Sequence, residues 1–600
     1  MDTSILDFGA VSGGKVLCTE AFRRAVEACA ASGGGYVDVP SGKYLTGTVA
    51  LDDNVFLNLH PGAEILGSEK LTDYSGTTRG CAWSNAITSV SGNGSPDMDR
   101  CRGLIVADRK KNCGIVGPGK INGQRGADYG YSDEKGRPFL VVFSECSFVT
   151  VRDVRLEHTG MFTFYGLNCS DVVIDGVTIR TADSANGDGL DFDGGKRISI
   201  SNCDIDAGDD AIGLKTLTPD EPIVDFSVTN CHLRSHYWGG VRIGPESAGD
   251  MKRITVTGCT FTDCGDGFKL QLTQEAVYED FVFTGNVMHN VLRPLFVTMN
   301  RYNMSRYVSD VRPPMGAFRR VIFSDTVAEM SPDFVFPGLT IRSGNFISSV
   351  PGYAIEDFTI ENVHFLAPGG GTEAEASRTT GHSELYDFYT LWPEHLVNMG
   401  NYPSAVLYLR HAKGVRLSNV TFETREPDAR PAVRAEDVDG LDLTFCREKN
   451  CGGLILKHRV TDYLSVGNRG TETDFSEAQA KDYEDFRSLS LAVDAEYEKI
   501  ASDAGKAAKL PLIDMEKGTS FSLPAGGPVT VLLPKVTGNF EVRAGGKTVY
   551  VRSLPALYIT PLPFALTVNV PEEEEILFEI VPLSDKFSLN ADAQIKKGAI

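Results

Sequence analysis

The sequence predicts an all-β fold: a parallel β-helix with an N-terminal helical cap and a small C-terminal β-sandwich appendage. A short motif with alternating apolar residues recurs through the middle of the chain, 26 to 28 residues apart in its central copies. A turn containing Asn or Gly and a second short strand follow each copy, with no helical periodicity between copies. Repeats of about 20–50 residues indicate solenoids or propellers. One coil of short strands per repeat favours the β-helix.

Three consecutive copies of the motif read ISISNC, FSVTNC and ITVTGC, and they end at Cys203, Cys231 and Cys259. The alternation buries one face of each strand, and stacked coils place equivalent residues about 4.8 Å apart. The three cysteines are therefore predicted to form an interior ladder, and Asn202 and Asn230 a ladder of turns. The 13 cysteines include no CxxC pair, and we interpret them as reduced core thiols.

The two ends of the chain have different patterns. Residues 19–31 are typical of an amphipathic helix, with Phe22, Val26 and Cys29 on one face. A solenoid end exposes strand edges and core, so this helix is expected to cap it. The expected organisation is a cap with the first coils at 1–70, a catalytic β-helix at 71–465, a helical linker at 466–509 and a β-sandwich appendage at 510–600.

Composition narrows the class of protein. The 600 residues carry a net charge of −22, with 42% hydrophobic and 23% charged residues, which is ordinary for a globular protein. The acidic balance argues against nucleic acid and anionic membrane surfaces as partners, and no apolar run approaches the roughly 18 residues of a membrane span. The first residues show no basic and apolar targeting regions. We therefore expect a cytoplasmic location, or secretion if a leader is missing.

Two acidic segments lie beside apolar strands in the middle copies. The first reads NGDGLDFD from residue 186, and the second reads GDD from residue 208. The stacking of the coils follows from aligning the inward apolar pairs, which are Leu190/Phe192, Ile212/Leu214, Val241/Ile243 and Phe268/Leu270. This alignment predicts that Asp188, Asp209 and Asp210 converge on one exterior face.

The same alignment predicts an outward column beside these aspartates. The residue between the two members of each inward pair is Asp191, Gly213, Arg242 or Lys269 in successive coils. Arg242 and Lys269 are therefore expected to form a cationic patch, held together by an anion or by a nearby carboxylate such as Asp191. Trp238 would be an aromatic platform beside this patch.

Clustered carboxylates can divide the work of acid and base. They raise one another's pKa values, which suits one as a proton donor and the others as bases. Inverting glycosidases use such a pair about 6.5–9.5 Å apart, with room for water. The alternatives are that these aspartates cap turns or bind Ca²⁺.

The run NGDGLDFDGGKRISISNCDIDAGDDAIGLK resembles the core of glycoside hydrolase family 28, the polygalacturonases. The family pattern is NTDG, then Gly-Asp-Asp, then GHG, then RIK, and the likeness extends from DFGA at residue 7 to about residue 445. This resemblance implies a right-handed parallel β-helix and hydrolysis with inversion, without metal or cofactor. Carried over by motif, Asp209 is the general acid, and Asp188 and Asp210 hold and activate the water.

The sequence departs from the family pattern at two motifs. Tyr237-Trp238-Gly239 replaces GHG, with His236 two positions before Trp238, and Lys269-Leu270-Gln271 replaces RIK. Lys269 keeps one of the family's carboxylate-binding charges, and Arg242 is the candidate for the other. The residues expected to bind substrate are Asn186, His236, Trp238, Arg242, Lys269, Gln271 and Arg301.

We interpret the chain as a glycoside hydrolase acting on pectin-derived oligosaccharides, with exo-acting galacturonidase-like activity. A long loop after Gly371, with His382 and Trp392, would close one end of the cleft and give exo action. The first alternative is a glycosidase for rhamnose or another neutral sugar. A second is a Ca²⁺-dependent uronate lyase or epimerase with Lys269 or Arg242 as base. A third is a non-catalytic β-helix, which has no reason to stack carboxylates.

Overall fold

The computed structural model describes most of the solenoid and the strands of the C-terminal part. The described residues are 3–77, 102–124, 137–184, 186–236, 238–299, 315–331, 344–377, 402–481, 483–484, 519–523, 527–537, 540–552, 562–570, 576–582, 588–589 and 594–597. Two compact units divide the chain. The first unit comprises Met1–Met299, Pro314–Thr372 and Ser404–Thr473.

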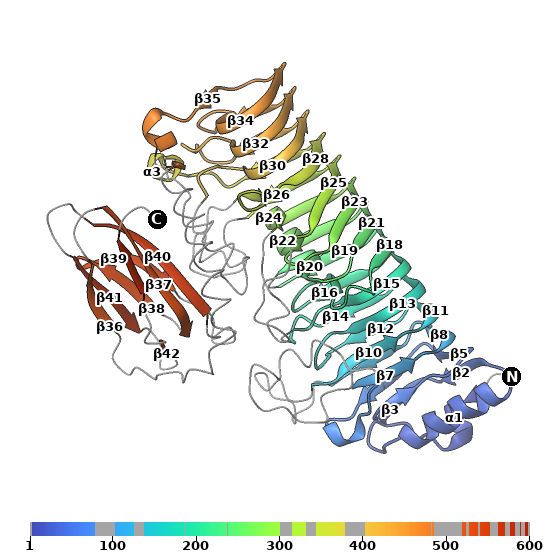
Figure 1. The fold of residues 1–600 in the computed structure, drawn as a ribbon. Helices are drawn as coiled ribbons and strands as arrows, with labels where there is room; N and C mark the ends of the chain where they lie inside the picture. Colours follow the sequence, from blue (N-terminus) through green and yellow to red (C-terminus); the bar gives the residue numbers. More distant parts are fainter. Residues whose placement is uncertain are drawn as a thin grey trace. The chain divides into compact units, whose positions relative to one another are not determined.

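The first unit is a stack of coils built from parallel strands (Figure 1). Its opening coils contain β1 (Thr3–Ser4), β2 (Gly35–Val39), β3 (Gly42–Thr46), β4 (Val49–Ala50), β5 (Val55–Leu59), β6 (Ala63–Gly67), β7 (Gly103–Asp108), β8 (Lys111–Val116) and β9 (Lys120–Asn122). The strands pair in parallel with their equivalents in the next coil, as β2 does with β5 and β5 with β8. The predicted parallel β solenoid is therefore confirmed.

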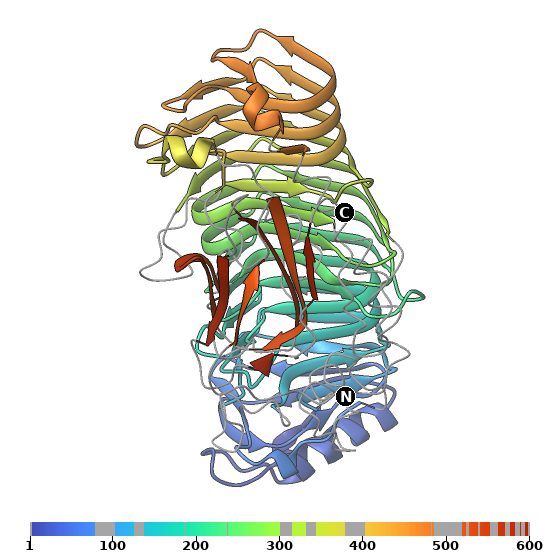
Figure 2. The same cartoon turned by 60° about the vertical axis from the view of Figure 1, so that its left-hand side comes forward.

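The helix predicted over residues 19–31 is α1 (Thr19–Ala31), and its predicted apolar face is buried. Two short 3-10 helices, η1 (Ile5–Phe8) and η2 (Leu71–Asp73), flank these first coils. The helix α1 packs against β2, β4 and β5, and Figure 2 shows it at the N-terminal end of the stack. Its Phe22 and Cys29 are fully buried, so the helix extends the apolar core beyond the first strands.

The middle coils contain the acidic segments. Their strands are β10 (Phe139–Ser144), β11 (Ser147–Arg152), β12 (Arg155–Glu157), β13 (Phe164–Asp175), β14 (Thr178–Arg180), β15 (Leu190–Ser201), β16 (Asp204–Ala207), β17 (Ile212–Thr216), β18 (Ile223–Thr229), β19 (His232–Ser235), β20 (Gly239–Ser247), β21 (Met251–Thr257), β22 (Thr260–Leu272), β23 (Val277–Thr284) and β24 (Val287–Met299). The remaining coils continue the same pairing. Their strands are β25 (Ala317–Ser324), β26 (Val327–Met330), β27 (Asn345–Ser348), β28 (Ile355–Glu361), β29 (His364–Ala367), β30 (Leu407–Ser418), β31 (Thr421–Thr424), β32 (Val433–Thr444), β33 (Arg447–Lys449), β34 (Ile455–Val466) and β35 (Glu472–Asp474).

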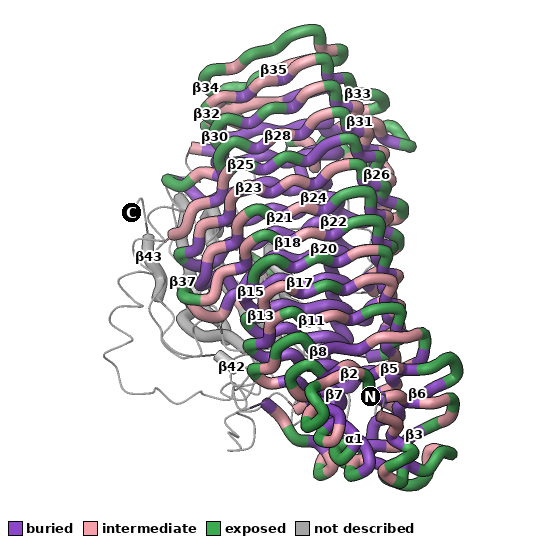
Figure 3. The backbone as a smooth tube through the Cα atoms, turned by 90° about the vertical axis from the view of Figure 1, so that its right-hand side faces the viewer, coloured by how far each residue is buried: buried purple, intermediate pink, exposed green. Residues whose placement is uncertain are grey.

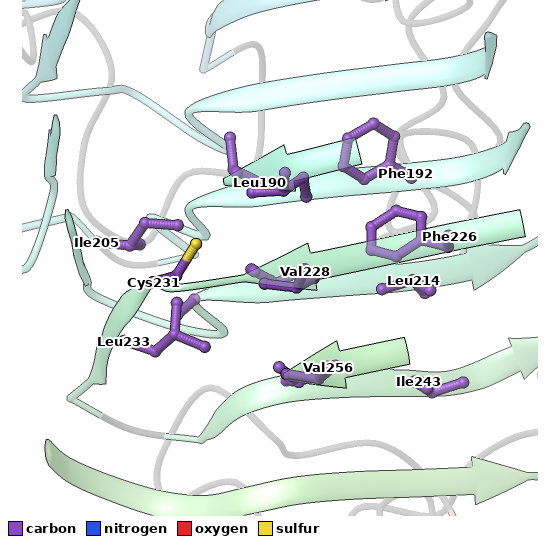
Figure 4. Packing of buried hydrophobic residues seen from close by; sticks show 14 of the residues in the cluster. Leu190, Phe192, Ile205, Leu214, Phe226, Val228, Cys231, Leu233, Ile243 and Val256 are labelled. Carbon is purple, nitrogen blue, oxygen red and sulfur yellow. The ribbon is translucent and has the colours of Figure 1, made fainter. Parts of the chain in front are cut away.

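The register of the middle strands agrees with the alignment made from sequence. Leu190 pairs with Ile212, Ile212 with Val241, and Val241 with Phe268. These inward residues are fully buried, and the side chains in Figure 4 pack between neighbouring coils. Burying one such side chain contributes about 1.5–3 kcal/mol. The alternation of buried and more exposed positions is visible along β18, β21 and β23 (Figure 3).

Both predicted ladders are present. Cys203, Cys231 and Cys259 are each 1% exposed, and the amide of Cys231 donates to the Sγ of Cys259 at 3.5 Å. Asn230 donates from Nδ2 to the Oδ1 of Asn202 at 2.7 Å. Both asparagines have φ near +50°, a left-handed conformation that Asn tolerates better than most residues. The described cysteines are free thiols, whereas Cys81 and Cys101 fall outside the described residues.

The second unit comprises Asn300–Pro313, Glu373–Pro403 and Asp474–Ile600. Two antiparallel sheets occur in its last part: β36-β41-β38-β39, and β40-β37-β42 with β43 also paired to β37. Their strands are β36 (Thr519–Leu523), β37 (Gly527–Thr537), β38 (Phe540–Ala544), β39 (Lys547–Arg552), β40 (Leu562–Val570), β41 (Ile576–Pro582), β42 (Ser588–Leu589) and β43 (Gln594–Lys597). The short helix α3 (Glu373–Ala376) also belongs to this unit. Among the described helices, none is long and apolar enough to cross a membrane.

Candidate active site

The three aspartates predicted to converge do so. Asp188 lies two residues before β15, and Asp210 and Asp209 lie two and three residues before β17 in the next coil. One carboxylate oxygen from each of the three lies within 4.8 Å of the others. Asp188 is 3% exposed, Asp209 9% and Asp210 1%. The cluster is therefore far more buried than the exterior face expected from the sequence.

Glycines in the two acidic segments permit this close approach. A Cβ on Gly189 would lie 2.3 Å from the carbonyl oxygen of Ala211, and one on Gly208 would lie 2.2 Å from that of Ser184. Neither backbone oxygen can move without disturbing the stack. The Gly189 amide instead donates to the carbonyl of Asp210 at 2.9 Å. The glycines thus bring the chain segments that hold the aspartates into direct backbone contact.

The three aspartates have different partners. Lys215 donates from Nζ to the Oδ2 of Asp188 at 3.4 Å. Arg242 donates from a terminal guanidinium nitrogen to the Oδ2 of Asp210 at 3.0 Å. The Oδ1 of Asp210 also accepts from the amide of Gly239 at 2.8 Å. Two of the three carboxylates therefore each contact a buried cation.

Asp209 has neutral partners. Its Oδ1 accepts from the amide of Asp210 at 3.0 Å, and its Oδ2 faces the amide nitrogen of Asn186 at 3.5 Å. Its backbone carbonyl accepts from the hydroxyl of Ser235 at 2.8 Å. Among the described residues, no cation forms an ion pair with Asp209. It therefore has the least stabilisation as an anion by direct contact.

The electrostatic environment agrees with this difference. Burial, together with the charges of Asp188 and Asp210, raises the pKa of Asp209 well above its usual value. Burial and the charge of Asp191 also raise the pKa of Asp188, and the positive charge of Lys215 opposes that rise. Arg242 and Lys269 oppose the rise for Asp209. The pKa is raised at both residues, so it is the absence of a cation contact at Asp209, among the described residues, that distinguishes it as the candidate proton donor.

Lys215 was not assigned a role from the sequence. Its Nζ bonds to Asp191 and lies 4.4 Å above the ring of Phe162. Burial raises the pKa of Asp191 to about 7, with Lys215 opposing the rise. A Cβ on Gly213 would lie 2.2 Å from the Oδ1 of Asp191. Glycine at this outward position therefore leaves the space in which Asp191 and Lys215 meet.

The predicted outward column is present, but its ion pairs differ from those expected. Asp191 pairs in register with Gly213, Gly213 with Arg242, and Arg242 with Lys269. The alternative in which Asp191 holds Arg242 and Lys269 together is wrong, because Asp191 contacts Lys215. Arg242 contacts Asp210 instead. The alignment identified the column correctly but could not show which long side chains reach across it.

Lys269 lies against the predicted aromatic platform. Its Nζ is 4.3 Å from the centre of the Trp238 ring and 4.0 Å from the Oδ2 of Asp266. Asp266 also accepts two hydrogen bonds from the guanidinium of Arg293, at 2.5 and 2.8 Å. A desolvated cation over an aromatic ring is stabilised by up to about 2 kcal/mol. The ring and the carboxylate together define the position of the ammonium group.

The other predicted substrate-binding residues are placed differently. Asn186 lies beside Asp209 and accepts a hydrogen bond from Arg137 at 2.8 Å. The Nε2 of His236 lies 2.9 Å from the Oδ1 of Asp206, so its pairing is with a neighbouring strand. Gln271 is fully buried on β22, two residues beyond Lys269. Arg301, like Tyr237 and the loop residues His382 and Trp392, lies outside the described residues.

Three residues around the site escaped the sequence analysis: Lys215, Arg137 and Ser235. Ser235 accepts from the amide of Trp238 at 3.0 Å while it donates to Asp209. A signal existed for Lys215, because it follows inward Leu214 and so falls on the outward face beside Asp193. Ser235 lies on β19 in register with Ala207 of the preceding coil, but its hydrogen bonds depend on tertiary structure, as does the position of Arg137.

Residues 70–310, which include all the described site residues, match the family model for glycosyl hydrolases family 28. The chain resembles the family 28 glycosyl hydrolases. The predicted resemblance is therefore confirmed by a match that is independent of the structural argument.

The proteins to which the chain is similar include polygalacturonases. A probable polygalacturonase from Vitis vinifera is 24% identical over 317 residues, covering 50% of this chain and 62% of that protein. An exo-poly-alpha-D-galacturonosidase from Dickeya chrysanthemi is 27% identical over 361 residues, covering 52% and 59%. The chain thus spans about three fifths of the length of these relatives. Among solved structures, a hyperthermoactive exopolygalacturonase from Thermotoga maritima is 20% identical, covering 61% of this chain and 87% of that chain, with a TM-score of 0.49.

Proposed function

We propose that the chain is a glycoside hydrolase that cleaves pectin-derived galacturonate oligosaccharides. The observation that carries this proposal is the unequal pairing of the three aspartates. Asp188 and Asp210 contact Lys215 and Arg242, whereas Asp209 contacts neutral donors. This arrangement suits a set of two bases and one acid. The family match and the names of the relatives support galacturonan as the substrate.

Asp209 is the general acid in this proposal. Its proton passes to the glycosidic oxygen as the bond to the anomeric carbon breaks, which leaves Asp209 ionised. A water molecule attacks the anomeric carbon and gives its proton to Asp188 or Asp210. Two oxygens that accept from the same water lie about 4.5 Å apart. The separations of up to 4.8 Å between the carboxylate oxygens therefore suit one water held between Asp188 and Asp210.

The stereochemical outcome belongs to the proposal. We propose inversion, following the family resemblance and the water position. The carboxylates are nevertheless closer than the roughly 6.5–9.5 Å that is usual for an inverting pair, and closer to the roughly 5–5.5 Å of a retaining pair. The spacing thus favours retention as the second candidate, in which Asp188 or Asp210 attacks the sugar directly.

Recognition of the uronate is assigned to Lys269. Its ammonium group sits over Trp238 on the strand beside the acidic cluster. Arg242 is committed to Asp210, so we assign it to the base rather than to the substrate. An exo mode is proposed from the name of the Dickeya relative. If Lys269 contacts only Trp238 and Asp266 and does not bind the substrate, we expect the enzyme to cleave a neutral sugar.

The finer features of the fold belong to the same proposal. We take the solenoid to be right-handed, with α1 as the cap of its first coils. The two antiparallel sheets formed by β36–β43 are proposed to form a β-sandwich appendage. We keep the expected boundaries at about residues 70 and 509, and we place the end of the solenoid after β35, which belongs to its sheet, instead of at the expected residue 465.

One screen tests the proposed function. Purified protein is incubated with defined oligogalacturonates, with rhamnose-containing oligosaccharides and with aryl glycosides of neutral sugars, and the products are separated by chromatography. We expect galacturonate monomer to appear first from the oligogalacturonates. Release of internal fragments would overturn the exo mode. Cleavage of neutral glycosides alone would overturn the substrate, and an unsaturated product absorbing in the ultraviolet would indicate a lyase.

A further inference from the structure

Lys215 is enclosed beside the acidic cluster. It is 3% exposed, on β17. Its Nζ bonds to Asp191 and lies 3.4 Å from the Oδ2 of Asp188, with the ring of Phe162 at 4.4 Å on another side. A buried ammonium is stable only with nearby carboxylates. The ammonium group of Lys215 thus lies between the carboxylate of Asp188, in the acidic cluster, and that of Asp191 on β15.

The two carboxylates that Lys215 joins each keep an unused oxygen. The Oδ1 of Asp188 and the Oδ2 of Asp191 are buried and accept no hydrogen bond from any described residue. An unsatisfied buried acceptor costs about 1–3 kcal/mol, and more when it is charged. The Oδ1 of Asp188 is thus an acceptor that has not been neutralised by the fold. It is the atom of this residue available to take a proton from water.

Several other charged groups influence this pair. Those facing this pair or Lys215 from the neighbouring elements are Asp209 and Asp210 before β17, Asp193 on β15, and Arg242 and Glu246 on β20. Carboxylates outnumber cations in this set. Their negative charges favour the protonated forms of Asp188 and Asp191. Arg242 contacts Asp210. Lys215 is the cation in contact with Asp188.

We propose that Lys215 is a positioning residue that holds Asp188 in its ionised form, so that Asp188 can accept the proton of the attacking water. The proposal rests on the proposed function, because it assigns Lys215 a part in that reaction. Lys215 touches neither substrate nor water; it acts through Asp188. Asp191 also forms an ion pair with the ammonium group of Lys215. This second carboxylate makes burial of the cation possible.

The first arm of the test is a pH profile. Lys215→Met removes the charge and keeps the volume of the stem. Loss of a neighbouring opposite charge raises a carboxyl pKa by about 1–3 units, so the acid limb of kcat/KM should move to higher pH by at least about one unit. Activity at pH 5 should fall about tenfold or more, and the loss should shrink as the pH rises. A purely structural role would lower activity equally at every pH.

The second arm does not need activity. Without Lys215, the native state holds protons on Asp188 and Asp191 that the unfolded chain releases above its ordinary carboxyl pKa of about 4. A state that binds more protons loses stability as the pH rises. The melting temperature of Lys215→Met relative to wild type should therefore be close at pH 4.5 and fall progressively further behind towards pH 8. A deficit that stays constant with pH would overturn the proposal.

A matched control removes an equally buried cation elsewhere in the solenoid. Arg430 is 1% exposed and bonds to Asp428 through two nitrogens, at 3.0 and 2.7 Å. Arg430→Met should keep the acid limb of the wild type. If Lys215→Met fails to fold, Lys215→Gln is measured in its place.

The combined outcomes separate the two claims. A pH-dependent deficit in stability with an unmoved acid limb would mean that Lys215 serves Asp191 alone, which overturns the proposal. If the wild-type protein cleaves none of the oligosaccharides, the proposed function fails. The stability arm then still decides whether Lys215 maintains the charge of the cluster.

Discussion

The inward and outward residues of β15, β17, β20 and β22 alternate along the same four strands yet differ in kind. The inward positions are Leu190, Ile212, Val241 and Phe268, all apolar and fully buried. The outward positions one residue later are Asp191, Gly213, Arg242 and Lys269. Three of these outward residues are charged and lie 6% exposed or less. The same register thus buries hydrocarbon on one face and charge on the other.

The difference teaches how a repetitive fold acquires a site. Inward positions repeat their character from coil to coil, because each must bury a similar apolar surface against its neighbours. Outward positions change in every coil, and their charges are stabilised only by specific partners. The repeated inward residues therefore indicate the fold, and the outward positions where the residue type changes indicate the site.

The largest expected effect is the loss of activity when the acidic cluster is changed at Asp209. Asp209→Asn keeps the shape of the side chain but removes the transferable proton. General acid catalysis contributes about 10²–10⁴-fold, so kcat on an oligogalacturonate should fall by at least that factor. Circular dichroism and the melting curve should remain those of the folded protein. Turnover close to wild type would show that Asp209 is not the acid.

The matching change on the inward face is Phe268→Ala. Phe268 is fully buried and stacks on Phe283 with ring centres 4.2 Å apart. Phe→Ala in a core costs about 3–5 kcal/mol of unfolding free energy, which denaturant titration would measure. Below the melting transition, the acid limb of the pH profile should be unchanged. A large shift of that limb with little loss of stability would contradict the division between the two faces.

Much of this division could be predicted from the sequence. The spacing of the repeats defined the coils, and the inward pairs gave a register that the structure confirms. That register placed Asp188, Asp209 and Asp210 together before any geometry was known. The spacing of the repeats and the alternation of apolar residues are local properties of the sequence. They can therefore be read without knowing where each side chain points in the structure.

The ion pairs could not be predicted in the same way. Asp191 was one of two candidates, beside a bound anion, for holding Arg242 and Lys269 together, but it bonds to Lys215. A register gives backbone positions, whereas the side chain of Lys215 reaches past Asp193, its partner in register, to Asp191 on the same neighbouring strand. The space beside Gly213, where a Cβ would meet Asp191, decides the pairing. Burial of the cluster was also missed, because a repeat pattern carries no information about what covers a face.

A smaller effect distinguishes the two outward cations. Lys269→Met should reduce kcat/KM on a galacturonide by about 10–150-fold, the value of a hydrogen bond of about 1.5–3 kcal/mol to a charged group. Activity on the matching neutral glycoside should change little. Arg242→Met should instead reduce activity on both substrates, because Arg242 holds Asp210. Equal losses for Lys269→Met on both substrates would favour a neutral-sugar glycosidase.

No effect is expected from metal removal. Asp188, Asp209 and Asp210 offer ligand atoms close enough to hold a cation such as Ca²⁺. The proposed hydrolysis needs Asp209 protonated, which a bound cation would oppose. Activity should therefore survive prolonged incubation with EDTA. Abolition by EDTA and recovery with Ca²⁺ would support the lyase or epimerase.

The most direct test of the account follows the first product in real time. Proton NMR of an oligogalacturonate digest reports both the saturation and the anomeric form of the new sugar before mutarotation. We predict a saturated reducing sugar with the anomer opposite to that of the cleaved linkage, as expected for a water held between Asp188 and Asp210. A retained anomer would mean that a carboxylate attacks the sugar itself. An unsaturated product would contradict hydrolysis altogether.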